Sequence, residues 1–274
     1  MIVHLIDGTY ELFRHFYGAR RFNKGRDRPL GAVVGVVNTV LEMVEKGATH
    51  LGVATDHVIE SFRNELWAAY KTGEGIEPAL SAQFIPLEDA LTAMGVATWA
   101  MIELEADDAL ASAAHLAARD DRVERVCIWT PDKDLAQCVV GDRVVQMDRK
   151  TNTIRNAEGV RAKYGVDPRA IPDFLALVGD SADGYPGLSG IGRVTAARLI
   201  SKYGPLEEFP PAVLGERLPL ALLFKQLATL RTDAPLFAEV DALRWRGPTA
   251  RFPATAQRLG DTRLLTRSQK SAVT

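Results

Sequence analysis

Nine acidic side chains stand where an apolar run ends or where a helical pattern begins, the places at which a folded chain turns. They are Asp7, Asp56, Glu105, Asp107, Asp108, Asp132, Asp134, Asp180 and Asp183. Taken singly, each acid has an ordinary explanation as a helix cap or a solvated turn residue. If they gather in one place, their like charges repel one another strongly unless cations lie among them.

Oxygen is the only ligand atom that this acidic set offers. The histidines His4, His15, His50, His57 and His115 have no ligand spacing to one another, and Cys127 and Cys138 fit no zinc or redox motif. Carboxylate oxygens select hard cations such as Mg²⁺ or Mn²⁺. Two such ions about 4 Å apart can clamp a phosphodiester while one activates the attacking water and the other stabilises the leaving oxygen. We therefore expect metal-assisted phosphodiester hydrolysis.

Short apolar runs alternate with helical patterns in the first half of the chain. Residues 2–6, 50–55 and 125–130 are strand-like, and between them residues 31–46 and 106–119 carry apolar side chains at helical spacing. This alternation predicts a parallel α/β sheet. Ligands bind such sheets at the carboxyl ends of the strands. Asp7, Asp56 and Asp132 follow three of these runs, so we expect them at one edge.

The pattern changes near Asp167, where helices joined by glycine-rich turns replace the strand signals. We therefore expect an α/β domain over residues 1–166 and a smaller helical, DNA-binding region over residues 167–274. The stretch from Arg251 to Thr274 is weakly patterned and is expected to be partly loose.

Composition places the chain among soluble globular proteins, with 47% hydrophobic and 25% charged residues. The sequence shows no signal peptide and no apolar run of membrane-spanning length, so we expect a cytoplasmic protein without a membrane partner. The net charge of −2 is low for a DNA-binding protein, but bound cations supply charge that composition does not count. The basic run from Arg20 to Arg28 is expected either to grip duplex phosphates or to form a solvated loop.

Five sequence blocks in a fixed order carry a family resemblance. They are Leu5-Ile6-Asp7-Gly8, Phe62-Arg63 with Tyr70-Lys71, Glu105-Ala106-Asp107-Asp108, Thr130-Pro131-Asp132-Lys133-Asp134, and Gly179-Asp180-Ser181-Ala182-Asp183 followed by residues 186–192. With these blocks the chain resembles the 5′-nuclease domain of bacterial DNA polymerase I and the related flap endonucleases, a branch of the PIN-like nucleases.

The resemblance implies a PIN-like central parallel sheet flanked by helices, with a helical arch at about residues 60–80. It implies that the nine acids hold two or more Mg²⁺ or Mn²⁺ ions. Arg63 and Lys71 would act as catalytic contacts to the scissile phosphate, and Tyr70 would stack on a base. An ordinary amphipathic surface face is the alternative for these three residues.

The block after Asp183 resembles a helix-hairpin-helix motif at about residues 185–202. The resemblance implies DNA-phosphate contacts at Gly187, Gly190 and Gly192, with a K⁺ ion held by the turn, and a plain tight turn is the alternative. Arg193 or Lys202 is expected to replace the phosphate contact of the lysine that the family usually has at position 194. Two positions depart from the family pattern. Val194 stands where a lysine is usual, and Glu74 stands where an arginine is common.

These features together predict a structure-selective 5′→3′ exonuclease and flap endonuclease that acts on DNA with 5′ ends, flaps or branches, in replication or repair. Two alternatives remain open. A PIN-type ribonuclease shares the carboxylates but does not need the helix-hairpin-helix turn, and a branched-DNA-binding protein with weak catalysis would explain Glu74 and Val194.

Overall fold

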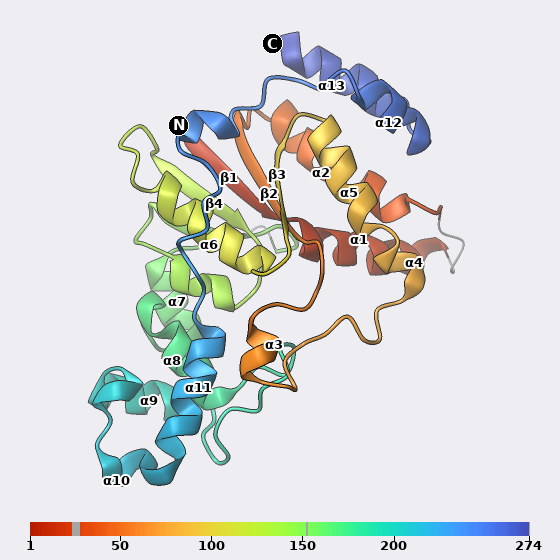
Figure 1. Ribbon diagram of the computed structural model, residues 1–274. Coiled ribbons are helices and arrows are strands. Elements are labelled where there is room, and N and C mark those ends of the chain that lie inside the picture. Colours follow the sequence, from red (N-terminus) through yellow and green to blue (C-terminus); the bar gives the residue numbers. More distant parts are fainter. Residues whose placement is uncertain (24–27, 152, 274) are drawn as a thin grey trace.

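A six-stranded sheet lies at the centre of the computed structural model, which describes residues 1–23, 28–151 and 153–273 (Figure 1). Its strands are β1 (Ile2–Asp7), β2 (His50–Asp56), β3 (Ala97–Met101), β4 (Arg125–Trp129), β5 (Val144–Asp148) and β6 (Thr153–Arg155). They lie in the order β3-β2-β1-β4-β5-β6, and all neighbours are parallel except β5 and β6. The expected parallel α/β sheet is confirmed.

Strand register brings the expected acids to one edge. Asp7 is the last residue of β1 and pairs with Ala54, so Asp56 ends β2 two residues further along. Trp129 ends β4 next to Ile6, and Asp132 follows after a short turn. Parallel strands that stop together leave their carboxyl ends as an open edge where turn residues meet.

Two layers of helices cover the sheet. On one face lie α1 (Gly8–Asn23), α2 (Gly31–Glu45) and α5 (Phe84–Ala93), and on the other lies α6 (Ala106–Ala117). The apolar stripe of α2 supplies Val33, Val36, Val37 and Val40 to the first layer, and all four are fully buried. Successive side chains of a strand point to opposite faces of the sheet, so a strand that is apolar throughout needs a helix layer on each face.

A second hydrophobic core lies in the helical region at the lower left of Figure 1, and Tyr70 and Ala136 from the chain before β5 also belong to it. Its helices are α7 (Ala157–Tyr164), α8 (Ile171–Val178), α9 (Arg193–Tyr203), α10 (Pro211–Leu214) and α11 (Leu218–Ala228). Helices α8 and α11 pack against each other through Phe174 and Phe224. This core ends at Ala228, so the helical region is smaller than residues 167–274.

The chain after Ala228 returns to the sheet, contrary to the expectation of a loose tail. Trp245 donates its backbone N–H to the carbonyl of Thr49, and α12 (Phe252–Arg258) and α13 (Arg263–Val273) pack on α5 and α2. Phe252 and Leu264 are fully buried there. The sequence analysis missed these helices because α12 has only seven residues and α13 is polar overall, although the apolar side chains of α13 do lie on one face.

The segment expected as a helical arch has little helix. It contains only the single-turn helices α3 (Arg63–Leu66) and α4 (Pro78–Ser81), with irregular chain between them. Gly73, Gly75 and Pro78 interrupt any longer helix. None of the helices in the described ranges combines the length and apolar character of a membrane span.

We predict that Phe252→Ala lowers the free energy of unfolding by about 3–5 kcal/mol, because it empties a buried aromatic site beneath α12. Urea denaturation measures this loss. The control is Val194→Ala at a side chain that is 81% exposed, where stability should stay the same. Equal stability of the two variants would show that α12 does not belong to the core.

Candidate metal and phosphodiester site

A first group of carboxylates lies at the ends of β1 and β2 and at the start of α6. Asp7 accepts hydrogen bonds from the Tyr10 backbone N–H (2.8 Å) and the Thr130 hydroxyl (3.0 Å). Asp56 accepts one from the Ala106 backbone N–H (2.8 Å), which ties the end of β2 to α6. These bonds fix both side chains at the sheet edge before any ligand binds.

Burial and mutual repulsion raise the pKa values in this first group. The pKa of Asp7 rises to about 7, chiefly through burial and then through Asp56 and Asp132. Burial, followed by Asp132 and Asp7, holds the pKa of Asp107 well above its usual range. The pKa of Asp56 is raised by burial as well. Carboxylates of the sheet edge and of α6 therefore lie within electrostatic reach of one another.

A second group consists of Asp134, Asp180 and Asp183. Each offers one oxygen, and these atoms all lie within 4.8 Å of one another. Burial first, and then the neighbouring aspartates, raises the pKa of Asp134. Burial together with Asp180 and Asp132 raises the pKa of Asp183 to about 6, although Lys71 opposes the shift.

Asp132 stands between the two groups. Its charge raises the pKa of Asp7 and Asp107 in the first group and of Asp134 and Asp183 in the second. Its Oδ1 accepts the backbone N–H of Asp134 at 2.9 Å, and its side chain is exposed. An exposed carboxylate shared by two groups can contact ligands in both.

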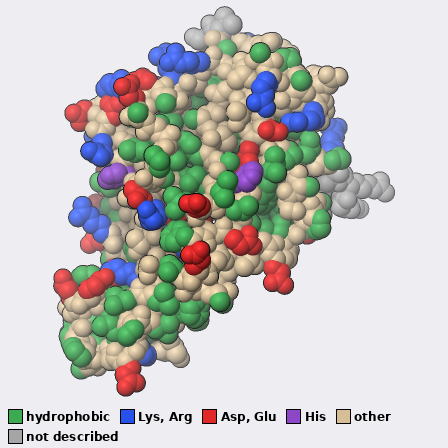
Figure 2. Space-filling view, in the orientation of Figure 1, with side chains coloured by type: hydrophobic (Ala, Val, Ile, Leu, Met, Phe, Trp, Pro, Cys, Tyr) green, Lys and Arg blue, Asp and Glu red, His purple; other side chains and the backbone are tan. Residues whose placement is uncertain are grey.

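Two lysines supply positive charge beside the acids. The Nζ atom of Lys71 lies 2.7 Å from Glu105 and 3.5 Å from Asp183, and Lys133 pairs with Asp180. The Lys71 backbone N–H donates to the carbonyl of Asp183, so the loop before α4 is tied to the second group. Figure 2 shows acidic side chains near the middle of this face, with basic side chains mainly toward its margin.

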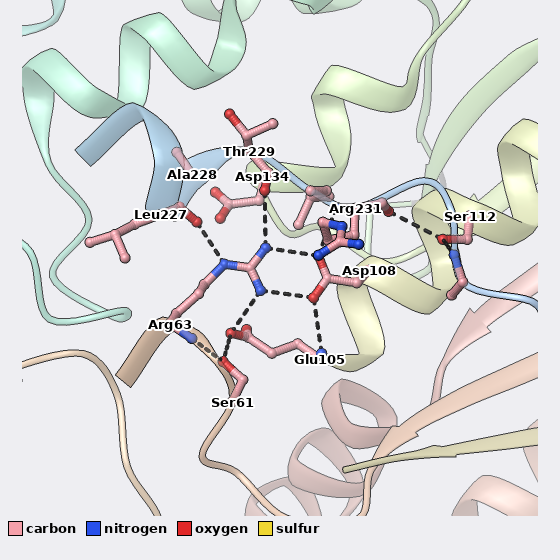
Figure 3. A network of polar contacts seen from close by, with 12 residues as sticks. Ser61, Arg63, Glu105, Asp108, Ser112, Asp134, Leu227, Ala228, Thr229 and Arg231 are labelled. Atoms are coloured by element: carbon pink, nitrogen blue, oxygen red, sulfur yellow. Dashed lines mark hydrogen bonds and ion pairs between the residues drawn. The ribbon is translucent and has the colours of Figure 1, made fainter. Parts of the chain in front are cut away.

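Arg63 does not face this site, which corrects its expected contact with the scissile phosphate. Its side chain is 1% exposed and pairs with both Asp108 oxygens at 2.8 Å and with Glu105 at 3.1 Å (Figure 3). It also donates to the carbonyls of Leu227 and Thr229. Every donor direction is satisfied inside the protein, so Arg63 joins α3, α6 and the end of α11.

Burial also makes two further predictions wrong, those of Asp108 as a metal ligand and of Tyr70 as a base-stacking residue. Asp108 is fully buried, and its oxygens accept from Arg63 and from the backbone N–H groups of Glu105 and Arg231. It is part of a capping box with Glu105 and has no free oxygen for a metal. Tyr70 is 3% exposed within the second core, where no base can stack on it.

The glycines of the expected helix-hairpin-helix turn differ in their surroundings. Gly187 is buried, and a Cβ there would lie 2.3 Å from the backbone nitrogen of Gly179, so it serves packing and is not a DNA contact. Gly190 and Gly192 are exposed with open space around them, and Gly190 has a φ of 79°. Their backbone remains available to a phosphate.

Arg193 and Lys202 lie on α9, which begins directly after this turn, and both side chains are exposed. Their DNA contacts stay predictions. Of the basic run, Lys24 and Arg26 lie outside the described residues.

Several polar residues of the site were missed from the sequence. Ser61 donates to Glu105 at 2.6 Å, Thr9 accepts the Asp56 backbone N–H, and Gln146 donates to the Asp132 carbonyl at 2.6 Å. Gln146 is 1% exposed within β5, and a polar side chain inside an apolar strand was the one available signal. Serine and threonine are too common in turns to stand out.

The donor set fits divalent cations. The seven acids Asp7, Asp56, Asp107, Asp132, Asp134, Asp180 and Asp183 offer oxygen alone, the atom that hard cations prefer. Oδ1 of Asp134 is buried and has no hydrogen-bond partner among the described residues. A buried carboxylate oxygen is costly without a partner, and a cation would satisfy it. Glu105 already meets Lys71 and Arg63, so its metal contact stays a prediction.

Fold and site together define an α/β protein with a polycarboxylate site at the carboxyl edge of a parallel sheet. Residues 2–165 match the family model of the 5′-3′ exonuclease N-terminal resolvase-like domain, and residues 166–251 match that of the 5′-3′ exonuclease C-terminal SAM fold. The chain belongs to the 5′-3′ exonuclease family. The family that the sequence blocks predicted is thus confirmed.

Curated relatives include exonucleases and polymerases. The 5′-3′ exonuclease of Buchnera aphidicola subsp. Baizongia pistaciae is 31% identical over 250 residues, covering 84% of this chain and 81% of that protein. DNA polymerase I of Pseudomonas aeruginosa is 35% identical over 259 residues, 87% of this chain. The chain spans 28% of the length of that polymerase.

Solved structures share the fold at low sequence identity. T5 5′-exonuclease with bound zinc covers 100% of this chain and 98% of its own, with a TM-score of 0.65 and 19% identity. The catalytic core of Rad2 in complex with DNA substrate covers 98% of this chain and 91% of its own, with a TM-score of 0.63 and 14% identity. These likenesses confirm the central sheet flanked by helices.

We predict that Arg63→Met lowers the free energy of unfolding by about 3–5 kcal/mol, because it leaves the charge of Asp108 buried without its partner. Chemical denaturation measures the loss. Arg161→Met is the matched control, since Arg161 forms an exposed pair with Asp167 that contributes little. Unchanged stability with lost cleavage would return Arg63 to a catalytic role.

The raised pKa of Asp7 predicts a pH dependence of stability without metal. The unfolded chain releases this proton near pH 3.8 and the native protein near pH 7, so the native state holds more protons between them. Stability from this group therefore falls as pH rises from about 4 to 7. Asp7→Asn should raise the Tm in chelator at pH 8, and by less at pH 5.

Added Mg²⁺ should stabilise the unaltered protein at pH 8 more than it stabilises Asp7→Asn, because the substitution removes one ligand. Asp167→Asn, at an exposed acid outside the site, is the control and should leave the pH profile unchanged. A lower Tm for Asp7→Asn in chelator at pH 8 would contradict the repulsion argument.

Proposed function

We propose that this protein hydrolyses DNA phosphodiesters near free 5′ ends and branches, as a 5′→3′ exonuclease and flap endonuclease. The observation that carries the proposal is the convergence of seven carboxylates from distant segments at one edge of the sheet, with Lys71 beside them. The proposal places the activity in the cytoplasm, in DNA replication or repair.

Each of the two carboxylate groups would hold one metal ion. Asp7, Asp56, Asp107 and Asp132 would hold one Mg²⁺ or Mn²⁺ ion, and Asp134, Asp180 and Asp183 with Asp132 would hold another. Bound ions of this kind lower the pKa of a water molecule and stabilise the leaving oxygen. Lys71 projects from the loop before α4 into the space beside Asp183, where its ammonium would donate to a phosphate oxygen.

The helical region would hold the duplex beyond the cleavage point. Gly190 and Gly192 present an exposed turn at the start of α9, and we assign DNA phosphate and a K⁺ ion to their backbone. The Rad2 core was solved with a DNA substrate, which supports a DNA ligand for this fold. The C-terminal match favours this activity over a PIN-type ribonuclease, which has no need of the turn.

A branched-DNA-binding protein with weak catalysis is the second candidate. It is favoured by Val194, which is 81% exposed at the turn in place of the usual lysine, and by the exposed Glu74. A labelled 5′-flap substrate incubated with Mg²⁺ or Mn²⁺ separates the candidates. Metal-dependent cleavage near the junction supports the nuclease, retardation without cleavage supports the binding protein, and cleavage of RNA alone supports the ribonuclease.

We predict that Asp132→Ala abolishes cleavage of the 5′ flap while flap binding stays largely intact, since Asp132 is exposed and serves both carboxylate groups. Single-turnover cleavage and gel retardation measure the two effects separately. Asp167→Ala, which removes an exposed acid paired with Arg161 outside the two carboxylate groups, should cleave normally. Undiminished turnover in Asp132→Ala would refute its role as a metal ligand.

A further inference from the structure

A cluster of three basic side chains lies beside the carboxylates, on the side of the helical region. It consists of Arg155 at the end of β6, Lys163 near the end of α7 and Arg193 at the start of α9. Arg193 donates to the backbone carbonyl of Lys163 at 3.1 Å. Burial first, and then the charges of Arg155 and Arg193, lowers the pKa of Lys163. Three separate segments thus bring their positive charges together.

No carboxylate forms an ion pair with this cluster within the described part of the chain. The charges of Asp148 and Asp132 oppose the fall in the pKa of Lys163, and Arg155 helps to lower the pKa of Asp148, but no ion pair joins these groups. Arg161 on the same helix does pair, with Asp167 at 2.6 Å. Like charges that gather without a paired counter-charge favour the binding of an anion.

Tyr164 borders the cluster, and charges of the cluster and of the carboxylates both act on its pKa. Its ring is 5% exposed, with the Lys163 Nζ atom 4.9 Å and the Arg193 guanidinium 5.7 Å from its centroid. The Tyr164 hydroxyl is buried and has no hydrogen-bond partner among the described residues. Lys163 and Arg193 are thus both held against one buried aromatic ring.

Hydrogen bonds connect the cluster to the cleavage site. Nη1 of Arg155 donates to Gln146 Oε1 at 3.0 Å, and Gln146 Nε2 donates to the backbone carbonyl of Asp132 at 2.6 Å. Arg155 is therefore separated by one side chain from the loop whose carboxylate serves both groups. The cluster therefore connects Arg193, three residues after Gly190, with Arg155 beside the Asp132 loop.

We propose that Arg155, Lys163 and Arg193 form a phosphate-binding subsite for the DNA strand that runs between the carboxylates and the helix-hairpin-helix turn. This inference rests on the proposed function. The planar guanidinium groups match two phosphate oxygens at once, and the lysine adds a mobile point charge. The subsite supplies the positive charge that exposed Val194 does not. Its ligand is the DNA backbone, so it reads no sequence.

The test uses the full chain, a labelled 5′-flap DNA and Ca²⁺ in place of Mg²⁺, with binding measured over a range of salt concentrations. Lys163→Ala should weaken binding about tenfold at low salt, the loss of one charged contact. The slope of log affinity against log salt should fall by about 1. Lys163→Arg should restore both. Arg161→Ala, on the same helix but paired with Asp167, is the control and should match the unaltered protein.

Failure of this inference differs from failure of the proposed function. If the unaltered protein binds the flap and Lys163→Ala keeps the same affinity and salt slope, the subsite is refuted and the nuclease proposal stands. An equal loss in Arg161→Ala would also refute it, because the effect would be that of general charge. A protein that neither binds nor cuts the flap would overturn both proposals.

Discussion

Repulsion among buried carboxylates is the constraint on which the rest of this structure depends. Burial and neighbouring charges raise the pKa values of Asp7, Asp107, Asp134 and Asp183, so the site disfavours its own ionised state. Such a site persists because the surrounding fold holds it, by strand ends and backbone hydrogen bonds that do not depend on the ligand. Divalent cations would relieve this repulsion. The same carboxylates that lower the stability of the metal-free protein would therefore bind the ions that the proposed hydrolysis needs.

The fold meets this constraint with fixed cations at the border of the site. Arg63 neutralises Asp108 and Glu105 beneath the start of α6, where Figure 3 shows it among carbonyls from the end of α11. Lys71 and Lys133 neutralise Glu105 and Asp180 at the open side. The buried arginine therefore supports the fold around the site, whereas the partly exposed lysines are the groups that would exchange a carboxylate for a phosphate in the proposed reaction.

The core around the sheet and the core of the helical region each contribute residues to the site. Asp7, Asp56 and Asp107 come from the sheet and α6, whereas Asp180 and Asp183 follow α8 in the helical region. The charge of Asp132 raises pKa values on both sides, and Lys71 pairs with Glu105 and Asp183. Because the chain after Ala228 returns to pack on α2 and α5, the helical region is anchored at both of its ends. Each core supplies part of a site that neither completes alone.

The sequence by itself determined the parallel sheet, the acids at its edge and the family, because periodicity and turn chemistry are local properties that neighbouring residues report. Only the tertiary structure decided the roles of Arg63, Tyr70, Asp108 and Gly187, whose motif positions are typical of the family but whose side chains or Cα atoms are buried. It likewise decided that α12 and α13 cover the sheet. Burial depends on what distant segments bring to a residue, and no local pattern records that.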